Sequence, residues 1–354
     1  MNSSKSVLLW LFIGLIMVFV QVVVGGITRL TESGLSITKW EVVSGSIPPL
    51  SDVDWKEEFD LYKLTPQYEE INEGMTISQF KFIYFWEYIH RFWARIMGFV
   101  FIIPFFIFLR KKMLSPSLLR NLGVVVVLAL LAAVFGWIMV ASGLIERPWV
   151  NAYKLSIHLS IAFAVFGFLQ WTYLSEKYKN LSWVEIDRRL KILLFIFCSA
   201  YIIQLFLGGM MSGMKVAVVY PSWPKMNNEW IPSAIQNASE WNLQNLTNYD
   251  TNEFAPAFVH FMHRGTAYIL LIVFIFLWFK NLKDKKGLAE KSTNGNNLNM
   301  LGVVLLIQVI IGICTVLTSI GKVPLLGGVL HQVGALCLLA SIIYYIFTLK
   351  KKEL

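Results

Sequence analysis

FWEYIHRFWARIMGFVFIIPFFIFL, residues 85–109, opens with a Glu, a His and two Arg and then continues as an almost unbroken apolar run. The run is long enough to cross a lipid bilayer as a helix. Ionisable side chains are costly inside a membrane, so they indicate a functional site by default. A second stretch, FVHFMHRGTAY at residues 258–268, also places a His-Arg pair at the start of an apolar run. The two stretches predict a membrane protein with polar sites built into its helices.

The composition is that of a polytopic, all-α membrane protein. Of the 354 residues, 56% are hydrophobic and only 15% are charged, which is unusual for a soluble domain. The N-terminal apolar run is too long for the hydrophobic region of a signal peptide, so we expect it to be retained as the first helix. Eight segments have about the length that a bilayer requires. They cover residues 7–27, 83–109, 121–142, 154–174, 190–211, 255–279, 300–319 and 326–348.

The charges alternate between successive loops. The net charge is +9, and the basic residues follow the second, fourth and sixth spans and close the chain, whereas loop 28–82 is acidic. By the positive-inside rule both termini are cytoplasmic, and loops 28–82 and 212–254 face outward. Segment 283–299 is then a polar cytoplasmic linker. The basic surplus indicates topology in a bacterial inner membrane or an equivalent bilayer, and no basic patch requires a nucleic acid.

The spacing of the histidines reveals an internal repeat. The intervals from His90 to His263 and from His158 to His331 are equal, because 263 − 90 and 331 − 158 both give 173. One repeat contains four spans. An even number of spans returns the chain to the same side, so the two repeats have parallel topology and we expect a pseudo-twofold axis along the membrane normal.

Local similarity supports this repeat. QVVVGGITRL at residues 21–30 resembles QLFLGGMMSG at residues 204–213. The predicted domains are therefore an N-terminal half, residues 1–180, and a C-terminal half, residues 181–354, each a four-helix bundle.

All five histidines lie in predicted spans, close to the outward end of each span and so in the outer half of the bilayer. A single membrane histidine would be interpreted as an interhelical hydrogen bond, but two of these positions recur in both halves. Histidines on the second and fourth helices of a bundle can face each other across its interior, which suits bis-His ligation of a haem iron. A bare metal ion would need further ligands. The predicted haem sites are His90 with His158, and His263 with His331, while His260 is assigned a packing or supporting role.

Three arginines accompany these histidines. Arg91 and Arg264 each follow a predicted ligand directly, and Arg95 lies one turn deeper in the second span. A guanidinium there can pair with a haem propionate or hold a carboxylate. The alternative for Arg91 is a side chain that extends to the membrane surface.

One carboxylate breaks the symmetry of the repeat. Glu87 lies three residues before His90, on the same helix face, and its equivalent in the second half is His260. A carboxylate beside a haem can act as a general base or stabilise a developing cation. The alternative is a structural partner for Arg91 or Arg95. The asymmetry predicts one reactive site and one electron-transfer site.

These motifs resemble those of the haem A synthase family. The resemblance covers nearly the whole chain: GGITRLTESGLSITKWEVVSGSIPPL at residues 25–50, EYIHR at 87–91, GWIMVASGL at 136–144, and the histidines of the fourth, sixth and eighth spans. It implies eight helices in two pseudo-symmetric bundles. It also implies that one porphyrin methyl group of haem O is oxidised to the formyl group of haem A through an alcohol and a hydrated aldehyde.

The resemblance further assigns roles to the site residues. It implies a b-type haem held by His263 and His331, and a substrate haem at His90 and His158 with Glu87 required for the chemistry. Haem O is then the substrate and haem A the product. Haem O synthase and an electron acceptor are the expected partners besides the lipid bilayer.

The chain departs from some bacterial members of that family in its cysteines. Those members carry a cysteine pair in the first outer loop, whereas Cys198, Cys314 and Cys337 all lie within apolar runs here. Two other functions remain open: a di-haem b-type cytochrome that acts only in electron transfer, and a transporter. Glu87 argues against the first, since electron transfer needs no base, and broken helices with a polar midplane site are not evident for the second.

Overall fold

The computed structural model describes residues 4–39, 47–145, 147–179, 181–183, 186–285 and 292–352. Within these residues, eight helices are long and apolar enough to cross a membrane, and each corresponds to one predicted span. The prediction of an all-α, multi-pass membrane protein is therefore confirmed. The eight helices are α1 (Lys5–Leu30), α4 (Ile77–Arg110), α5 (Pro116–Gly143), α6 (Ala152–Lys177), α7 (Arg188–Gly213), α11 (Phe254–Lys285), α12 (Ser292–Leu317) and α13 (Leu325–Thr348).

Side-chain caps set where the membrane helices begin. The Thr76 hydroxyl accepts a hydrogen bond from the Gln79 main chain, and the Gln79 side chain accepts one from the Thr76 main chain, so α4 starts at Ile77. This capping box satisfies main-chain N–H groups that the helix leaves unpaired. It extends α4 beyond the apolar run, which predicted a start at residue 83. The predicted linker is likewise shortened, because α11 and α12 extend into it; its residues 286–291 lie outside the described residues.

The chain forms two compact units, Met1–Leu169 and Gln170–Leu354, called unit 1 and unit 2 below. The boundary lies inside α6, whereas the predicted boundary at residue 180 follows that helix. The last turns of α6 belong to unit 2 because they pack there: the Gln170 amide donates to the Ala340 carbonyl, 2.9 Å away. The assignment of one haem site to each half stays a prediction.

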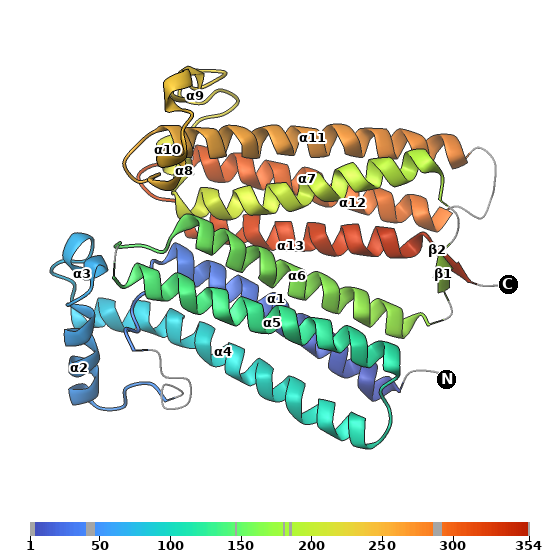
Figure 1. The fold of residues 1–354 in the computed structure, drawn as a ribbon, viewed down its shortest axis with the longest axis horizontal. Coiled ribbons are helices and arrows are strands. Elements are labelled where there is room, and N and C mark those ends of the chain that lie inside the picture. The colour runs from blue at the N-terminus through green and yellow to red at the C-terminus, as the bar shows by residue number, and fades with distance from the viewer. Residues whose placement is uncertain are drawn as a thin grey trace. The chain divides into compact units, whose positions relative to one another are not determined.

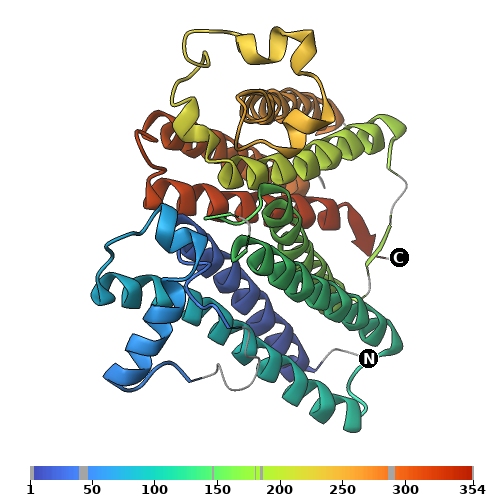
Figure 2. The ribbon, with the colours of Figure 1, turned by 60° about the vertical axis from the view of Figure 1, so that its left-hand side comes forward.

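Unit 1 contains α1, α4, α5 and most of α6. In both views α1 runs alongside α4, and α5 alongside α6 (Figures 1 and 2). Indole N–H groups join α1 to α4: Trp10 donates to the Val100 carbonyl at 3.0 Å, and Trp93 donates to the Met17 carbonyl at 3.0 Å. The pairing of low with high residue numbers shows that the two helices are antiparallel.

Two short helices, α2 (Asp52–Tyr62) and α3 (Pro66–Glu70), lie at the end of unit 1 where α4 begins (Figure 1). Trp55, Phe59 and Tyr62 recur at helical spacing on one face of α2, and they pack on Phe80 and Tyr84 of α4. This aromatic core holds α2 against the first turns of α4.

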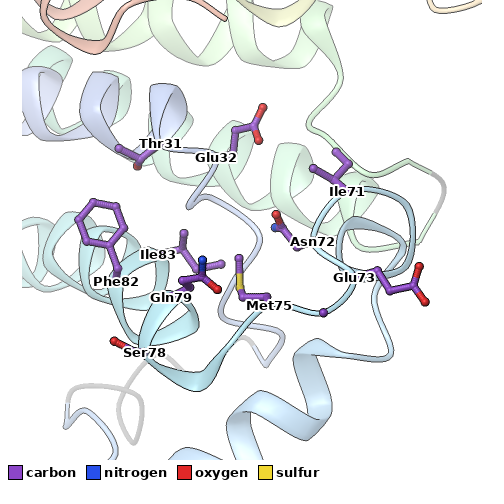
Figure 3. A pocket seen from close by; sticks show the side chains of 11 residues that line it. Thr31, Glu32, Ile71, Asn72, Glu73, Met75, Ser78, Gln79, Phe82 and Ile83 are labelled. Atoms are coloured by element: carbon purple, nitrogen blue, oxygen red, sulfur yellow. The ribbon is translucent and has the colours of Figure 1, made fainter.

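A cavity of about 620 Å³ opens beside this aromatic core. Figure 3 shows its lining side chains, which come from the two residues that follow α1, the connection between α3 and α4, and the first turns of α4. Glu32 and Glu73 supply its carboxylates, whereas none of the four repeated histidines lines it. The cavity is therefore separate from the histidine sites.

Unit 2 contains α7, α11, α12 and α13, which run side by side (Figures 1 and 2). The Tyr201 hydroxyl of α7 donates to the Ala335 carbonyl of α13 at 2.9 Å, and the Trp278 indole of α11 donates to the Asn299 side chain of α12 at 3.1 Å. The connection between α7 and α11 forms short helical elements at one end of the unit. They are α8 (Val216–Val219), α9 (Ser233–Gln236), a 3-10 turn (Ala238–Glu240) and α10 (Leu243–Thr247).

A two-stranded ribbon closes the other end of unit 2. Strand β1 (Leu181–Trp183) pairs antiparallel with β2 (Lys350–Lys352), so the segment before α7 is joined to the chain's C-terminal segment. The Lys350 ammonium lies over the Trp171 and Phe347 rings, 4.8 Å from each centroid, and burial there lowers the pKa of Lys350.

Candidate functional site

Each of the four repeated histidines faces the membrane helix that precedes its own. The contact always lies between consecutive spans, so each unit contains two helix pairs of this kind. The pairs are His90 of α4 with α1, His158 of α6 with α5, His263 of α11 with α7, and His331 of α13 with α12.

A glycine lets each histidine ring approach the neighbouring helix closely. A Cβ atom built on that glycine would meet the ring at Cε1, at a distance that is too short or tight for three of the glycines and an ordinary contact for Gly208. The pairs and distances are Gly25–His90 (2.9 Å), Gly136–His158 (3.0 Å), Gly208–His263 (3.4 Å) and Gly312–His331 (2.7 Å). The four glycines therefore form cradles in which the imidazole rings lie against main chain.

Polar partners from the same helices reach the ring nitrogens. The Gln21 amide nitrogen lies 3.3 Å from His90 Nδ1 and 3.4 Å from its Nε2, and it donates to the His90 carbonyl at 3.2 Å. His158 differs, because its Nδ1 donates to the Ala132 main-chain carbonyl at 2.8 Å.

The histidines of unit 2 both have glutamine partners. The Gln204 amide nitrogen lies 3.1 Å from His263 Nε2. The Gln308 amide nitrogen lies 3.2 Å from His331 Nδ1 and donates to the His331 carbonyl at 2.9 Å.

His263 and His331 face each other within unit 2. Their ring centroids are 6.4 Å apart and the ring planes are inclined at 68°. Two imidazoles on opposite sides of one metal, with metal–nitrogen bonds of about 2.0 Å, have ring centres roughly 6 Å apart. His263 Nδ1 is buried without a hydrogen-bond partner in the described part of the chain. This donor set and spacing fit a haem iron with two axial histidines.

His90 and His158 are the corresponding residues of unit 1. Across the described ranges, no group of three or more His, Cys, Asp or Glu side chains is placed to hold a metal ion. The assignment of the two histidine pairs as iron ligands stays a prediction.

Glu87 is buried in unit 1, only 2% exposed, and is surrounded by donors. Its Oε2 atom accepts hydrogen bonds from the Ser36 main chain at 2.7 Å, the Ser36 hydroxyl at 2.7 Å and the Ile37 main chain at 2.9 Å. Its Oε1 atom accepts from the Arg91 guanidinium at 2.6 Å. The carboxylate therefore joins α4 to the loop that follows α1, and of its two proposed partners it meets Arg91.

Arg264 holds a loop in the equivalent place of unit 2. It donates to His260 Nε2 at 2.9 Å, to the Ser222 carbonyl at 2.6 Å, and to the Pro224 and Lys225 carbonyls at 3.2 and 3.3 Å. His260, 1% exposed, thus stands where Glu87 stands in the first repeat, and as an acceptor from a guanidinium it is a neutral imidazole. It supports Arg264 and the loop that follows α7.

The arginines differ in what they reach. Arg91 also donates to the Ile37 carbonyl at 3.4 Å, so Arg91 and Arg264 both contact the loop after the first helix of their own half. Arg95 is half-buried, one turn further along α4. The predicted role of these arginines toward a haem propionate stays a prediction.

The glutamines and the facing glycines were missed in the sequence. The signal was present as the pattern Gln-x-x-x-Gly in three of the four partner helices. At residues 21–30 and 204–213 the pattern contributes to the similarity between the two repeats. The third copy is QVIIG at residues 308–312. Its role could not be predicted, because the sequence does not show that α12 packs against His331 of α13.

Comparison with known proteins identifies the family. A sequence model of the family described as cytochrome oxidase assembly protein matches residues 8–343. The chain belongs to this family. A protein named heme A synthase from Flavobacterium psychrophilum is 39% identical over 99% of this chain and 100% of its own length. Proteins of the same name from Flavobacterium johnsoniae and Parvibaculum lavamentivorans are 38% and 36% identical over 99% of this chain, and over 99% and 96% of their own lengths.

Proposed function

We propose that this chain is a haem A synthase, an enzyme of haem A biosynthesis that oxidises one methyl group of haem O to a formyl group. The observation that carries the proposal is the end-to-end similarity to proteins named heme A synthase, 36–39% identical over 99% of this chain. The two histidine pairs support it, because a haem substrate and an electron-transfer haem each need axial ligands.

The division of labour follows the asymmetry between the repeats. His90 and His158 bind the substrate haem, since Glu87 lies on the same helix as His90. His263 and His331 hold a b-type haem, which when bound supplies one-electron transfer. With water as the oxygen source, oxidation of the methyl carbon releases protons and passes electrons to an external acceptor.

The contacts of Glu87 favour a fixed negative charge over a base. A carboxylate oxygen has two lone pairs, and Oε2 already accepts three hydrogen bonds while Oε1 accepts one from Arg91. Little acceptor capacity remains for a proton from water. A held carboxylate instead stabilises positive charge that develops at the methyl carbon, and it orders the loop at Ser36 and Ile37.

The sidedness of the enzyme follows from its charges. Both termini are cytoplasmic, the protein lies in an inner membrane, and both haem sites lie toward the outer face. Haem O is hydrophobic and arrives within the bilayer, so haem O synthase is the supplying partner and a redox partner accepts the electrons.

Haem extraction from the purified, full-length protein tests the function. We expect haem B together with haem O or haem A. A preparation that contains haem B alone would favour the di-haem cytochrome, and one without haem would overturn both. His263→Ala and His331→Ala should each abolish the low-spin b-haem spectrum, and an unchanged spectrum in both variants would overturn this pair as ligands.

A further inference from the structure

Three of the four histidine cradles share a residue that the fourth lacks. One helical turn before the facing glycine, the partner helix carries a glutamine whose amide reaches the histidine ring. Four residues are about one turn of a helix, so the amide and the glycine lie on one face. The three pairs are Gln21–Gly25, Gln204–Gly208 and Gln308–Gly312, and the fourth helix has Ala132–Gly136 in the same register.

An iron-ligating histidine requires a partner for its second nitrogen. When one ring nitrogen binds a metal, the other carries a proton and donates it to an acceptor, which sets the ring orientation and raises the basicity of the ligand. The Oε1 atoms of Gln21, Gln204 and Gln308 are buried and have no hydrogen-bond partner within the described residues. Because an amide has a donor end and an acceptor end, rotation about its last bond presents Oε1 to the ring. For Gln21 and Gln308 this rotation gives up the hydrogen bond that the amide nitrogen donates to the histidine's own carbonyl, in exchange for the bond from the ring N–H.

We infer that Gln21, Gln204 and Gln308 are positioning residues for the haem-ligating histidines. This inference rests on the proposed function, because it requires haem at both pairs. Each glutamine accepts the proton of the non-ligating ring nitrogen, and its facing glycine keeps the ring within reach.

The fourth histidine is positioned by main chain instead. The Ala132 carbonyl can only accept, so His158 Nδ1 carries the proton and Nε2 keeps a lone pair for iron. A helix carbonyl cannot turn away, whereas the Gln21 amide can. His158 is therefore the fixed ligand of the substrate site, and His90 is the adaptable one.

The competing explanation is that buried glutamines only join helices. Gln170 provides the comparison, because it does this. It is 8% exposed, its amide nitrogen donates to the Ala340 carbonyl at 2.9 Å, and its Oε1 has no partner in the described ranges. It makes no hydrogen bond to a repeated histidine among those observed, so Gln170→Leu is a matched control in the same unit as His263 and His331.

The test is a redox titration of the low-spin C-terminal haem in the purified, haem-loaded, full-length protein. Gln204→Leu and Gln308→Leu should each raise its midpoint potential, because a less basic imidazole stabilises ferric iron less, and each should shift its electron paramagnetic resonance spectrum. Haem affinity should fall on the order of 10–100-fold. Gln170→Leu should leave the potential and the spectrum unchanged. If a Leu variant does not fold, Gln308→Asn, which withdraws the amide by one methylene, should shift the potential in the same direction.

The outcomes separate the two proposals. An intact low-spin haem whose potential does not move in either Leu variant overturns the positioning role and leaves the function standing. An equal shift in Gln170→Leu also overturns it, since packing alone would then be responsible. The absence of a low-spin haem from the unaltered protein defeats the proposed function itself.

Discussion

The Ser36 main-chain nitrogen and the Glu87 Oε2 atom lie 2.7 Å apart, which ties the loop after α1 directly to the buried carboxylate of α4. The Arg91 guanidinium closes the arrangement by pairing with Oε1 at 2.6 Å and reaching the Ile37 carbonyl at 3.4 Å. The residue proposed for the chemistry is therefore also the residue that orders the loop. Any substitution at Glu87 must be designed to separate these roles.

Glu87→Gln removes the charge and keeps the shape. Its amide oxygen can still accept from Ser36 and Ile37, so we expect the protein to fold, to keep its C-terminal haem and to bind haem O, yet to make little haem A. Breaking a buried ion pair by removing one partner costs up to about 3–5 kcal/mol, and the remaining hydrogen bonds should offset part of that. Extracted haems, separated by chromatography, measure the result.

Ser36→Ala is the control for the loop. It deletes one hydroxyl donor and leaves the two main-chain donors, so haem A formation should stay close to normal. Normal haem A production by Glu87→Gln would instead show that Glu87 is only a structural partner of Arg91. If Glu87→Gln loses its C-terminal haem as well, Glu87→Asp, which keeps the charge, should retain that haem.

Gly312→Ala should disturb the C-terminal haem. The added Cβ would lie 2.7 Å from His331 Cε1, closer than real contacts allow, so the ring must shift away from its position. We expect a weakened or altered low-spin absorption spectrum. Gly208→Ala, where the distance is 3.4 Å, should have a smaller effect.

Gly98→Ala is the matched glycine control. A Cβ there would meet nothing within 4 Å, and alanine favours a helix over glycine by roughly 1 kcal/mol. The low-spin haem absorption spectrum of Gly98→Ala should be the same as that of the unaltered protein. A disturbed spectrum in Gly98→Ala, or an undisturbed one in Gly312→Ala, would contradict the cradle geometry.

Alkaline pH should loosen α2 from α4. Burial raises the pKa of Tyr62 to about 12, against about 10 in an unfolded chain. The folded state binds the Tyr62 proton more tightly than the unfolded chain does. The contribution of Tyr62 to the free energy of unfolding is therefore complete below about pH 10 and is lost as the pH rises to about 12. The effect is on the order of 1–3 kcal/mol.

Hydrogen exchange of residues 52–70 measures this loss. Protection should fall between about pH 10 and 12 in the unaltered protein, after correction for the intrinsic exchange rate. Tyr62→Phe has no phenolic proton to lose, so hydrogen-exchange protection in this variant should not show the fall expected for the unaltered protein between these pH values. The same fall in Tyr62→Phe would assign the transition to other groups. The hydroxyl's bonds with Gln67 and Asn72 are lost in this variant, so its protection should be lower at neutral pH.

The orientation predicted from charge is tested with fusions. A reporter active only outside the cytoplasm should be silent after Leu354 and active near Asn237, because both termini are expected inside and loop 212–254 outside. The reverse pattern would place the histidine ends of the helices on the cytoplasmic side.

The membrane helices could be predicted because length and apolarity determine them almost alone. The eight spans and the repeated histidines needed only an apolar window and a constant interval. The start of α4 could not be read in this way, since a capping box between Thr76 and Gln79 extends the helix through polar residues. Nor could the short helices α2 and α3, because α2 is held by aromatic packing on α4 and Tyr68 of α3 packs on Phe59 and Tyr62 of α2.

The sequence predicts which residue types the candidate site contains, whereas the contacts that these residues make could not be predicted. The pairing of Arg264 with a haem propionate or a carboxylate stays a prediction, whereas its contacts with the carbonyls of Ser222, Pro224 and Lys225 were not expected. Loop paths that bring carbonyls to a guanidinium leave no pattern in a sequence. The same holds for Gln308, whose partner His331 could be known only once α12 was seen to pack on α13.

The bond from His158 to the Ala132 carbonyl has a consequence for how the histidine cradle of α5 and α6 tolerates substitution. Replacement of Gln21, Gln204 or Gln308 deletes a side-chain contact in one step, so those three cradles are vulnerable to point mutation. The carbonyl at position 132 survives any side chain that fits the helix, and only a change that breaks the helix there can remove it. Residue 132 can therefore be substituted without loss of the hydrogen-bond acceptor of His158. A substitution at Gly136, whose Cβ would meet the His158 ring, is the side-chain change that should disturb this cradle.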